Sequence, residues 1–155
     1  MIQLVRTTSD APDFKYLTQL FDTFLIDIDG EEKDFFAQYN QIYLQNVVVC
    51  YEDDVAIGCG ALKEYDAQTG EIKRMFVHPE HRNKGVANAI LQELEAWAGE
   101  LGFSSCILET SQKLENAIAL YKKFGYQPIA NYGQYIGVDS SVCMKKQFDF
   151  KASSQ

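Results

Sequence analysis

The stretch over residues 84–102 constrains the fold most strongly. Its apolar residues recur with the 3.6-residue period of an amphipathic helix, and they are Ala87, Ile90, Leu91, Leu94, Trp97, Ala98 and Leu101. A strand-like run at 71–77 precedes this helix, and Pro79 terminates the run. Such a helix buries its apolar face, and the preceding strand indicates that this face covers a sheet.

Two more helices are expected near the N-terminus, after a short strand that contains Ile2 and Leu4. Ser9 and Asp10 precede Pro12, so we expect them to cap the first helix. The second helix is expected over residues 32–43. The apolar faces of these helices consist of Phe14, Leu17, Phe21 and Phe24, and of Phe35, Phe36, Tyr39 and Ile42.

Strand patterns dominate the rest of the chain. The runs at 47–51 and 56–62 flank Glu-Asp-Asp and predict a hairpin, and further strands are expected at 106–109 and 136–144. Ser111 is expected to cap an intervening helix that ends at Gly125. The inner face of that helix consists of Leu114, Ile118, Tyr121 and Phe124. This order predicts an α/β (α+β) fold in which helices cover both faces of one sheet.

Size and charge limit the function classes. The 155 residues suffice for one domain, which we expect to span residues 1–150, with a frayed tail at 151–155. A hydrophobic fraction of 46% excludes general disorder. Lys and Arg number 14 and Asp and Glu number 22, so the formal net charge is −8. That charge disfavours nucleic acid and anionic membranes as partners.

The four cysteines, Cys50, Cys59, Cys106 and Cys143, lie far apart within apolar runs. Their spacing is not that of a metal site, so no metal is expected. We interpret them as buried thiols in a reducing compartment, with a disulfide between distant strands as the other interpretation. Residues 1–6 lack a secretory pattern, and no apolar stretch approaches the roughly 18 residues of a membrane span. The expected location is therefore the cytoplasm.

Basic residues gather where the strand at 71–77 ends and the long helix begins. Within residues 73–84 the one acid is Glu80, and the basic side chains are Lys73, Arg74, His78, His81, Arg82 and Lys84. Free amides at the helix start, the helix dipole and these cations suit a phosphate, and Gly85 lets a ligand approach the backbone. The alternative is an ordinary solvated helix start.

Two ordered motifs carry a resemblance to a known family. The sequence Arg82-Asn83-Lys84-Gly85-Val86-Ala87 resembles the Arg/Gln-x-x-Gly-x-Gly/Ala loop with which the GNAT superfamily of N-acetyltransferases binds the diphosphate of acetyl-CoA. Met75-Phe76-Val77-His78-Pro79 resembles the family's fourth strand and its Val-x-Pro exit. Residues 115–126 are similar to a later helix of the family, and residues 142–145 to its last strand. The resemblance thus covers essentially the whole chain.

The resemblance implies a mixed, mostly antiparallel sheet of about six to seven strands, splayed between strands four and five. It also implies acetyl-CoA as co-substrate, with its diphosphate on the amides of residues 83–87 and its pantetheine arm along the fourth strand. The residues implied to bind the coenzyme are Phe76, Val77, Arg82, Asn83, Lys84, Gly85, Val86, Ala87 and Asn116.

The implied chemistry needs a base, because an alkyl amine with a pKa near ~10 is almost wholly protonated at pH 7. Glu71 matches the spacing of the general base in the family's histone-modifying members, and a strand-end carboxylate without that role is the equal alternative. Glu109 and bound water are the other candidates. Tyr121 resembles the family's general-acid tyrosine and also fits a core aromatic. The backbone amide of Phe76 or Val77 is expected to donate a hydrogen bond to the oxyanion.

In the family, the first two helices and a late loop wall the acceptor site, which corresponds here to residues 24–36 and 131–135. The side chains that would attract or wall an amine there are Asp27, Asp29, Glu31, Glu32, Tyr132 and Tyr135. A solvated loop and edge aromatics are the alternative. The sequence therefore predicts an N-acetyltransferase for a primary amine of a small molecule, peptide or protein. A non-catalytic acyl-CoA binding or sensing module is the alternative, and a homodimer is compatible with both.

Overall fold

The protein is described here from a computed structural model, which covers residues 1–39 and 42–148; the expected tail at 151–155 lies outside them. In this described part, seven strands form one sheet in the order β1-β2-β3-β4-β5-β7-β6. Neighbouring strands are antiparallel except β4 and β5, which are parallel. The strands are β1 (Ile2–Thr7), β2 (Asn46–Glu52), β3 (Val55–Asp66), β4 (Thr69–Val77), β5 (Ser105–Ser111), β6 (Gln127–Ile129) and β7 (Ser141–Gln147).

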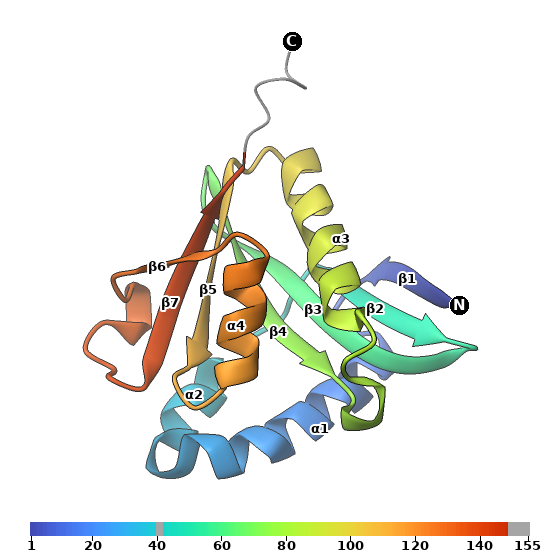
Figure 1. The fold of residues 1–155 in the computed structure, drawn as a ribbon, viewed down its shortest axis with the longest axis horizontal. Helices are drawn as coiled ribbons and strands as arrows, with labels where there is room; N and C mark the ends of the chain where they lie inside the picture. The colour runs from blue at the N-terminus through green and yellow to red at the C-terminus, as the bar shows by residue number, and fades with distance from the viewer. Residues whose placement is uncertain (40–41, 149–155) are drawn as a thin grey trace.

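Helices cover both faces of this sheet, so the expected α/β architecture is confirmed. The helices are α1 (Pro12–Asp29), α2 (Lys33–Tyr39), α3 (Val86–Glu100) and α4 (Glu115–Lys123). One buried cluster joins α3 and α4 to the sheet, and a second joins α1 to β2, β3 and β4. Figure 1 shows α3 and α4 in front of the strands, with α1 and α2 along the lower end of the sheet.

The helix that the sequence predicts most clearly is α3, and its predicted inner face is confirmed except at Leu101, which follows the last residue of the helix and is 49% exposed. Ile90, Leu91 and Leu94 are fully buried. Two glycines of β3 let the helix approach closely, since a Cβ added at Gly60 would lie 2.8 Å from Leu94 Cδ1 and one at Gly58 would lie 3.0 Å from Ile90 Cδ1. This packing fixes the start of α3 against the end of β4.

The sheet splays between β4 and β5, as the resemblance implies. The two strands pair over residues 69–72 and 105–108. Directly beyond this pairing, Arg74 has a positive φ of 57°, and the register with β3 shifts between Cys59 and Ala61. Such a bulge bends a strand and increases its local twist. The second half of β4 therefore turns away from β5, and the two arrows diverge in Figure 1.

Both predictions of a serine cap are wrong. Ser9 Oγ accepts a hydrogen bond from the amide of Leu44 at 2.8 Å, and α1 begins at Pro12 after an extended Ala11. Ser111 Oγ accepts from the amide of Lys113 at 3.1 Å, inside the turn that precedes α4. Each hydroxyl binds an amide outside the helix it was expected to cap.

Two predicted boundaries are also wrong. The second helix ends at Tyr39, and residues 40–41 lie outside the described part. Leu44 exchanges two hydrogen bonds with Ser9, and Ile42, which precedes it, is not helical. The strand expected from residue 136 begins at Ser141, because Asn131 Nδ2 donates to the carbonyls of Tyr135 and Val138 and closes a loop there. Strand β6 was not predicted separately.

The interpretation of the cysteines as buried thiols is confirmed. Cys50, Cys59, Cys106 and Cys143 are free and buried. Burial raises the pKa of each thiol, to about 12 for Cys59 and Cys106. None of these thiols is therefore an ionised nucleophile near neutral pH.

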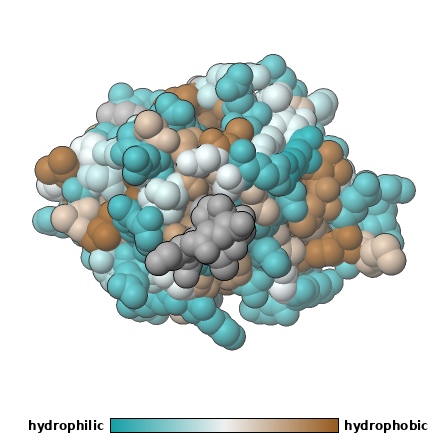
Figure 2. All heavy atoms as spheres, turned by 90° about the horizontal axis from the view of Figure 1, so that it is seen from above, coloured by the Kyte–Doolittle hydropathy of each residue, from teal (hydrophilic) through white to brown (hydrophobic). Residues whose placement is uncertain are grey.

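The surface is mixed. Seen from above the view of Figure 1, hydrophilic residues interrupt the hydrophobic ones (Figure 2). Within the described ranges, no helix is both long and apolar enough to cross a membrane.

Candidate active site

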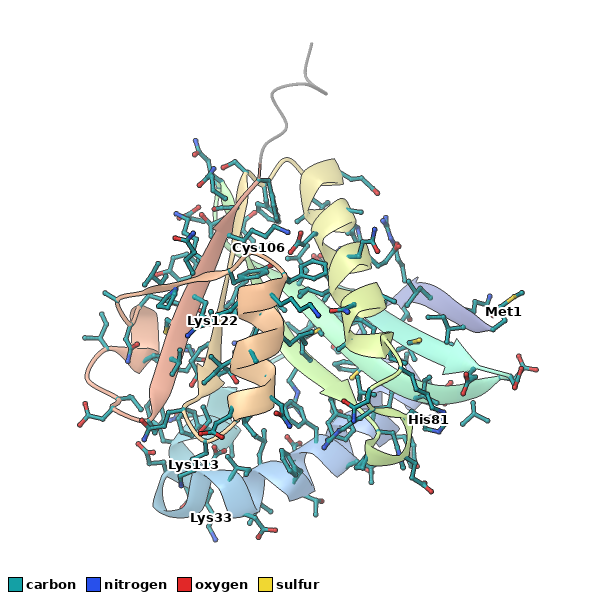
Figure 3. The ribbon with its side chains drawn as sticks, viewed as in Figure 1. Met1, Lys33, His81, Cys106, Lys113 and Lys122 are labelled. Carbon is teal, nitrogen blue, oxygen red and sulfur yellow. The ribbon has the colours of Figure 1, made fainter. Side chains whose placement is uncertain are left out.

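A cavity of about 850 Å³ lies at the splay. Its walls come from α1, Phe36 of α2, residues 71–77 of β4, the turn that leads into α3, the end of β5, α4 with the turn before it, and Tyr135. Two of the lining residues are labelled in Figure 3: Lys113 comes from the turn between β5 and α4, and His81 lies below the start of α3. The cavity therefore joins the turn before α3 to the region around the end of β5.

The turn before α3 lines this cavity with Arg82, Asn83 and Gly85. Asn83 and Gly85 have positive φ values of 64° and 82°, and Gly85 is the N-cap of α3. Successive amides in such a turn form a concave anion site, which the helix dipole reinforces. A Cβ added at Gly85 would meet no atom within 4 Å, so the space in front of this turn is open.

The cations of this region do not all converge on the turn, which corrects the expectation for Lys73 and Arg74. Arg74 Nη2 lies 2.7 Å from Asp22 Oδ1, and the arginine is buried under α1. Lys73 Nζ lies 3.6 Å from Glu71 Oε2. Arg82 remains at the turn, where its Nε donates to the carbonyl of Val77 at 3.0 Å.

The residues that the resemblance implies for coenzyme binding line the cavity, except Lys84. Those that line it are Phe76, Val77, Arg82, Asn83, Gly85, Val86, Ala87 and Asn116. Lys84 is exposed and is not part of the lining. Beyond residue 72, β4 is paired with β3 but not with β5, so the edge of β4 at Phe76 and Val77 faces the splay. A polar chain that lies along this edge has backbone groups to bind.

Tyr121 lines the cavity from α4 and is 7% exposed. Its ring packs edge-on against Tyr126, with the ring centroids 6.0 Å apart. Burial raises the pKa of its phenol, and the negative charge of Glu109 raises it further. The side chain is therefore both part of the core and a neutral proton donor at pH 7.

Glu109 lines the cavity from β5 and is the carboxyl whose proton affinity suits acid–base chemistry. Burial raises its pKa to about 7; a hydrogen bond from Ser141 and the charge of Lys73 partly oppose this effect, while Asp29 and Glu71 add to it. Ser141 Oγ donates to Glu109 Oε2 at 2.6 Å. The hydrogen bond fixes one oxygen and leaves the second available.

Glu71 also lines the cavity but is already occupied by neighbours. It is 5% exposed, and its Oε2 accepts a hydrogen bond of 2.7 Å from the hydroxyl of Tyr132. The same oxygen faces Lys73. Lys73, Ser141 and Tyr132 thus support the two carboxyls, and we did not single them out for this role from the sequence. The i, i+2 spacing of residues 71 and 73 on one strand face is the one signal that links any of them to the site.

Some of the residues that were predicted to wall the acceptor site line the cavity, and others do not. Asp29 and Tyr135 line the cavity, whereas Asp27, Glu32 and Tyr132 do not, and the side chain of Glu31 is not described. Two contacts tie this end together: Lys113 Nζ donates to the carbonyl of Ile28 at 2.9 Å, and Ser140 Oγ donates to Glu32 Oε1 at 2.6 Å. They hold the end of α1 against the loops that follow β5 and precede β7.

Over the described residues, no group of three or more His, Cys, Asp or Glu side chains is arranged to hold a metal ion.

The fold and these motifs define the class of the protein. The family model described as "Acetyltransferase (GNAT) family" matches residues 13–126. The chain belongs to this family, and its class is that of the acetyl-CoA-dependent acyltransferases.

Individual relatives agree with this assignment. An uncharacterized N-acetyltransferase of Bacillus subtilis, YsnE, is 43% identical over 89 residues, which cover 54% of this chain and 59% of that protein. A crystal structure of a protein proposed to be an acyl-CoA N-acyltransferase, from Klebsiella pneumoniae, is 25% identical with a TM-score of 0.82, covering 96% of this chain and 99% of that one. A GNAT family acetyltransferase from Elizabethkingia anophelis, with acetyl-CoA bound, shares the fold at 18% identity and a TM-score of 0.68, covering 95% and 98%.

Proposed function

We propose that the protein transfers the acetyl group of acetyl-CoA to a primary amine of a small molecule or a peptide. The observation that carries this proposal is the presence of Glu109 and Tyr121 in one cavity, where burial raises the pKa of Glu109 to about 7 and keeps the phenol of Tyr121 protonated at pH 7. Acyl transfer to an amine requires a group that accepts a proton and another that donates one. Coenzyme binding alone requires neither.

The open turn before α3 is the proposed site of the coenzyme's diphosphate. The amides of residues 83–87 would bind its oxygens, and Arg82 would supply a positive charge. The pantetheine arm would lie along the free edge of β4 at Phe76 and Val77, with Asn116 opposite. The Elizabethkingia protein of similar fold has acetyl-CoA bound, which supports acetyl-CoA as the co-substrate.

Glu109 is our preferred base. With a pKa of about 7 it is substantially ionised at neutral pH and can still take up a proton. Glu71, the first candidate from its spacing, is the weaker choice because its Oε2 already accepts from Tyr132 and faces Lys73. A water molecule between Glu109 and the substrate ammonium would serve as well as direct contact.

The reaction then balances as follows. Glu109 takes a proton from the ammonium, and the free amine attacks the thioester carbonyl, forming the C–N bond. The amide of Phe76 or Val77 stabilises the oxyanion of the tetrahedral intermediate. When the intermediate collapses, the C–S bond breaks and Tyr121 gives its proton to the leaving thiolate. The acylated nitrogen loses its second proton, which returns to the Tyr121 phenolate through solvent, and Glu109 releases the first proton to solvent. The products are the N-acetyl amine, free coenzyme A and one proton.

We also propose that residues 1–150 act as one domain and that the protein works in the cytoplasm. Both α1 and α3 pack on the same sheet, which supports a single folding unit. The four free, buried cysteines support a reducing compartment.

The test is release of free thiol from acetyl-CoA in the presence of a panel of amines and peptides, with the acetylated product identified by mass. We expect thiol release to depend on the amine and to fall by about 10²–10⁴-fold in Glu109→Gln. The exposed Glu64→Gln serves as the control and should keep full activity. Binding of acetyl-CoA without thiol release for any amine would instead identify a non-catalytic acyl-CoA-binding module.

A further inference from the structure

The apolar stripe of α1 continues beyond the part that the protein itself covers. Phe14 and Leu17 are buried against β2 and β3. The same stripe goes on through the second half of the helix at i, i+3, i+4 and i+7 with Phe21, Phe24, Leu25 and Ile28. These four side chains are partly exposed, and all four line the cavity. A helix face that stays apolar while it faces a cavity is suited to an apolar ligand.

Aromatic rings from other elements extend this apolar surface. Phe76 of β4 stacks on Phe21, with ring centroids 5.1 Å apart, and both rings line the cavity. Phe36 of α2 stacks on Tyr135, with centroids 6.5 Å apart and an angle of 26° between the planes, and these rings line it too. Offset stacking of a further ring on such surfaces is favourable.

At the end of the cavity where β5 ends, the charged groups are mostly acidic. Glu71, Glu109 and Asp29 line it, and Lys73 is the cation that lies among them. Two other cations line the cavity nearby: Arg74 is paired with Asp22, whereas Lys113 keeps its positive charge, since it binds the neutral carbonyl of Ile28 and acts on Asp29. The three carboxyls still outnumber the two cations without an acidic partner outside this group, Lys73 and Lys113, so this end favours an ammonium over a carboxylate.

We propose that the acceptor is a primary amine on an aromatic or otherwise apolar body, without a carboxylate beside the amine, as in an arylalkylamine. This inference rests on the proposed acetyl transfer and names its substrate class. The ammonium lies beside Glu109, and the apolar body lies against Leu25 and Ile28 of α1. An α-amino acid brings its carboxylate to Glu71 and Asp29, and a diamine brings its second ammonium onto the apolar stripe, so both are poor acceptors.

Three matched amines test this proposal with the unmodified protein: 2-phenylethylamine, phenylalanine, which adds a carboxylate, and 1,4-diaminobutane, which replaces the ring with a second ammonium. We expect kcat/KM for 2-phenylethylamine to exceed that of each of the others by at least about 10-fold, the scale at which an apolar pocket discriminates. Equal or better use of phenylalanine or the diamine overturns the substrate class while leaving the acetyltransferase activity intact.

Two variants of neighbouring residues on α1 locate the contact. Leu25→Ala should raise KM for 2-phenylethylamine about 10-fold and leave KM for acetyl-CoA unchanged. Ile26→Ala is the matched control, because Ile26 is 52% exposed and is not part of the cavity lining. Equal effects of the two variants overturn the assignment of the apolar body to this stripe. If coenzyme A binds but no amine releases thiol, the proposed function itself fails, and the substrate class fails with it.

Discussion

Replacing Glu109 by Gln is expected to raise the stability of the protein and to lower its activity. The carboxyl is partly buried, and desolvation raises its pKa from the ordinary value of 4.5 to about 7. Because the folded state binds this proton more tightly than the unfolded chain, ionisation of Glu109 favours unfolding. The variant removes that ionisation and keeps an oxygen that can accept the hydrogen bond from Ser141 Oγ.

The size of the effect follows from the two pKa values. The difference between 4.5 and about 7 corresponds to about 3 kcal/mol, at about 1.4 kcal/mol for each tenfold change in proton affinity. The destabilisation is absent below pH 4.5, grows as the pH rises to 7 and is constant above it. Glu109→Gln should therefore be more stable than the unmodified protein by about 3 kcal/mol at pH 8 and by about 1 kcal/mol or less at pH 5.

Thermal melting at pH 5 and pH 8 measures this difference. At about 2–4 °C per kcal/mol for a domain of this size, the variant should melt roughly 6–12 °C higher at pH 8 and little higher at pH 5. Glu64→Gln removes the same charge from an exposed position and should show no such pH-dependent gain. A variant that gains nothing between pH 5 and pH 8, or that loses stability at pH 8, would refute the argument that desolvation raises the pKa of Glu109.

Three further predictions concern the same cavity. Gly85→Glu should abolish thermal stabilisation by coenzyme A because its carboxylate enters the phosphate site, whereas Gly85→Asn, which tolerates the left-handed backbone, should keep most of it; equal stabilisation of both variants would count against the site. Tyr121→Phe should lower kcat by about 10²-fold or more with coenzyme affinity nearly unchanged, and an unaltered kcat would remove its role as the acid. Lys73→Met should raise the pKa of Glu109 above about 7, because Lys73 lowers it. The acid limb of the kcat/KM profile should then move to higher pH, and an unmoved limb would assign that limb to another group.

The parts of the fold that follow local rules were predicted from the sequence. Helix α3 was recognised because its apolar period is long and uninterrupted, and the hairpin between β2 and β3 because the Glu-Asp-Asp link between the two runs is short and turn-rich. In the structure Asp53 and Asp54 of this link have positive φ. The caps were not predictable. The hydroxyl of Ser9 binds the amide of Leu44, which is 35 positions away in the chain, and this contact depends on how the segment before β2 returns to β1.

The candidate site also has one part that is visible in the sequence and one part that depends on the folded chain. The turn at residues 82–87 is a local motif that is visible in the sequence, and its proposed binding of the coenzyme stays a prediction. The proton affinity of Glu109 was not predicted, because it depends on burial by the assembled fold, on Ser141 from β7 and on Lys73 from β4. Glu71 looked stronger in the sequence because its spacing is visible there, whereas its hydrogen bond from Tyr132 is visible only in the folded chain.

The account depends most on the coenzyme lying in the splay between β4 and β5. A crystal structure of the protein with coenzyme A measures this directly. We predict that the diphosphate accepts hydrogen bonds from the amides of residues 83–87 and that the sulfur lies next to the hydroxyl of Tyr121. A diphosphate bound elsewhere, or a sulfur remote from both Tyr121 and Glu109, would contradict the account.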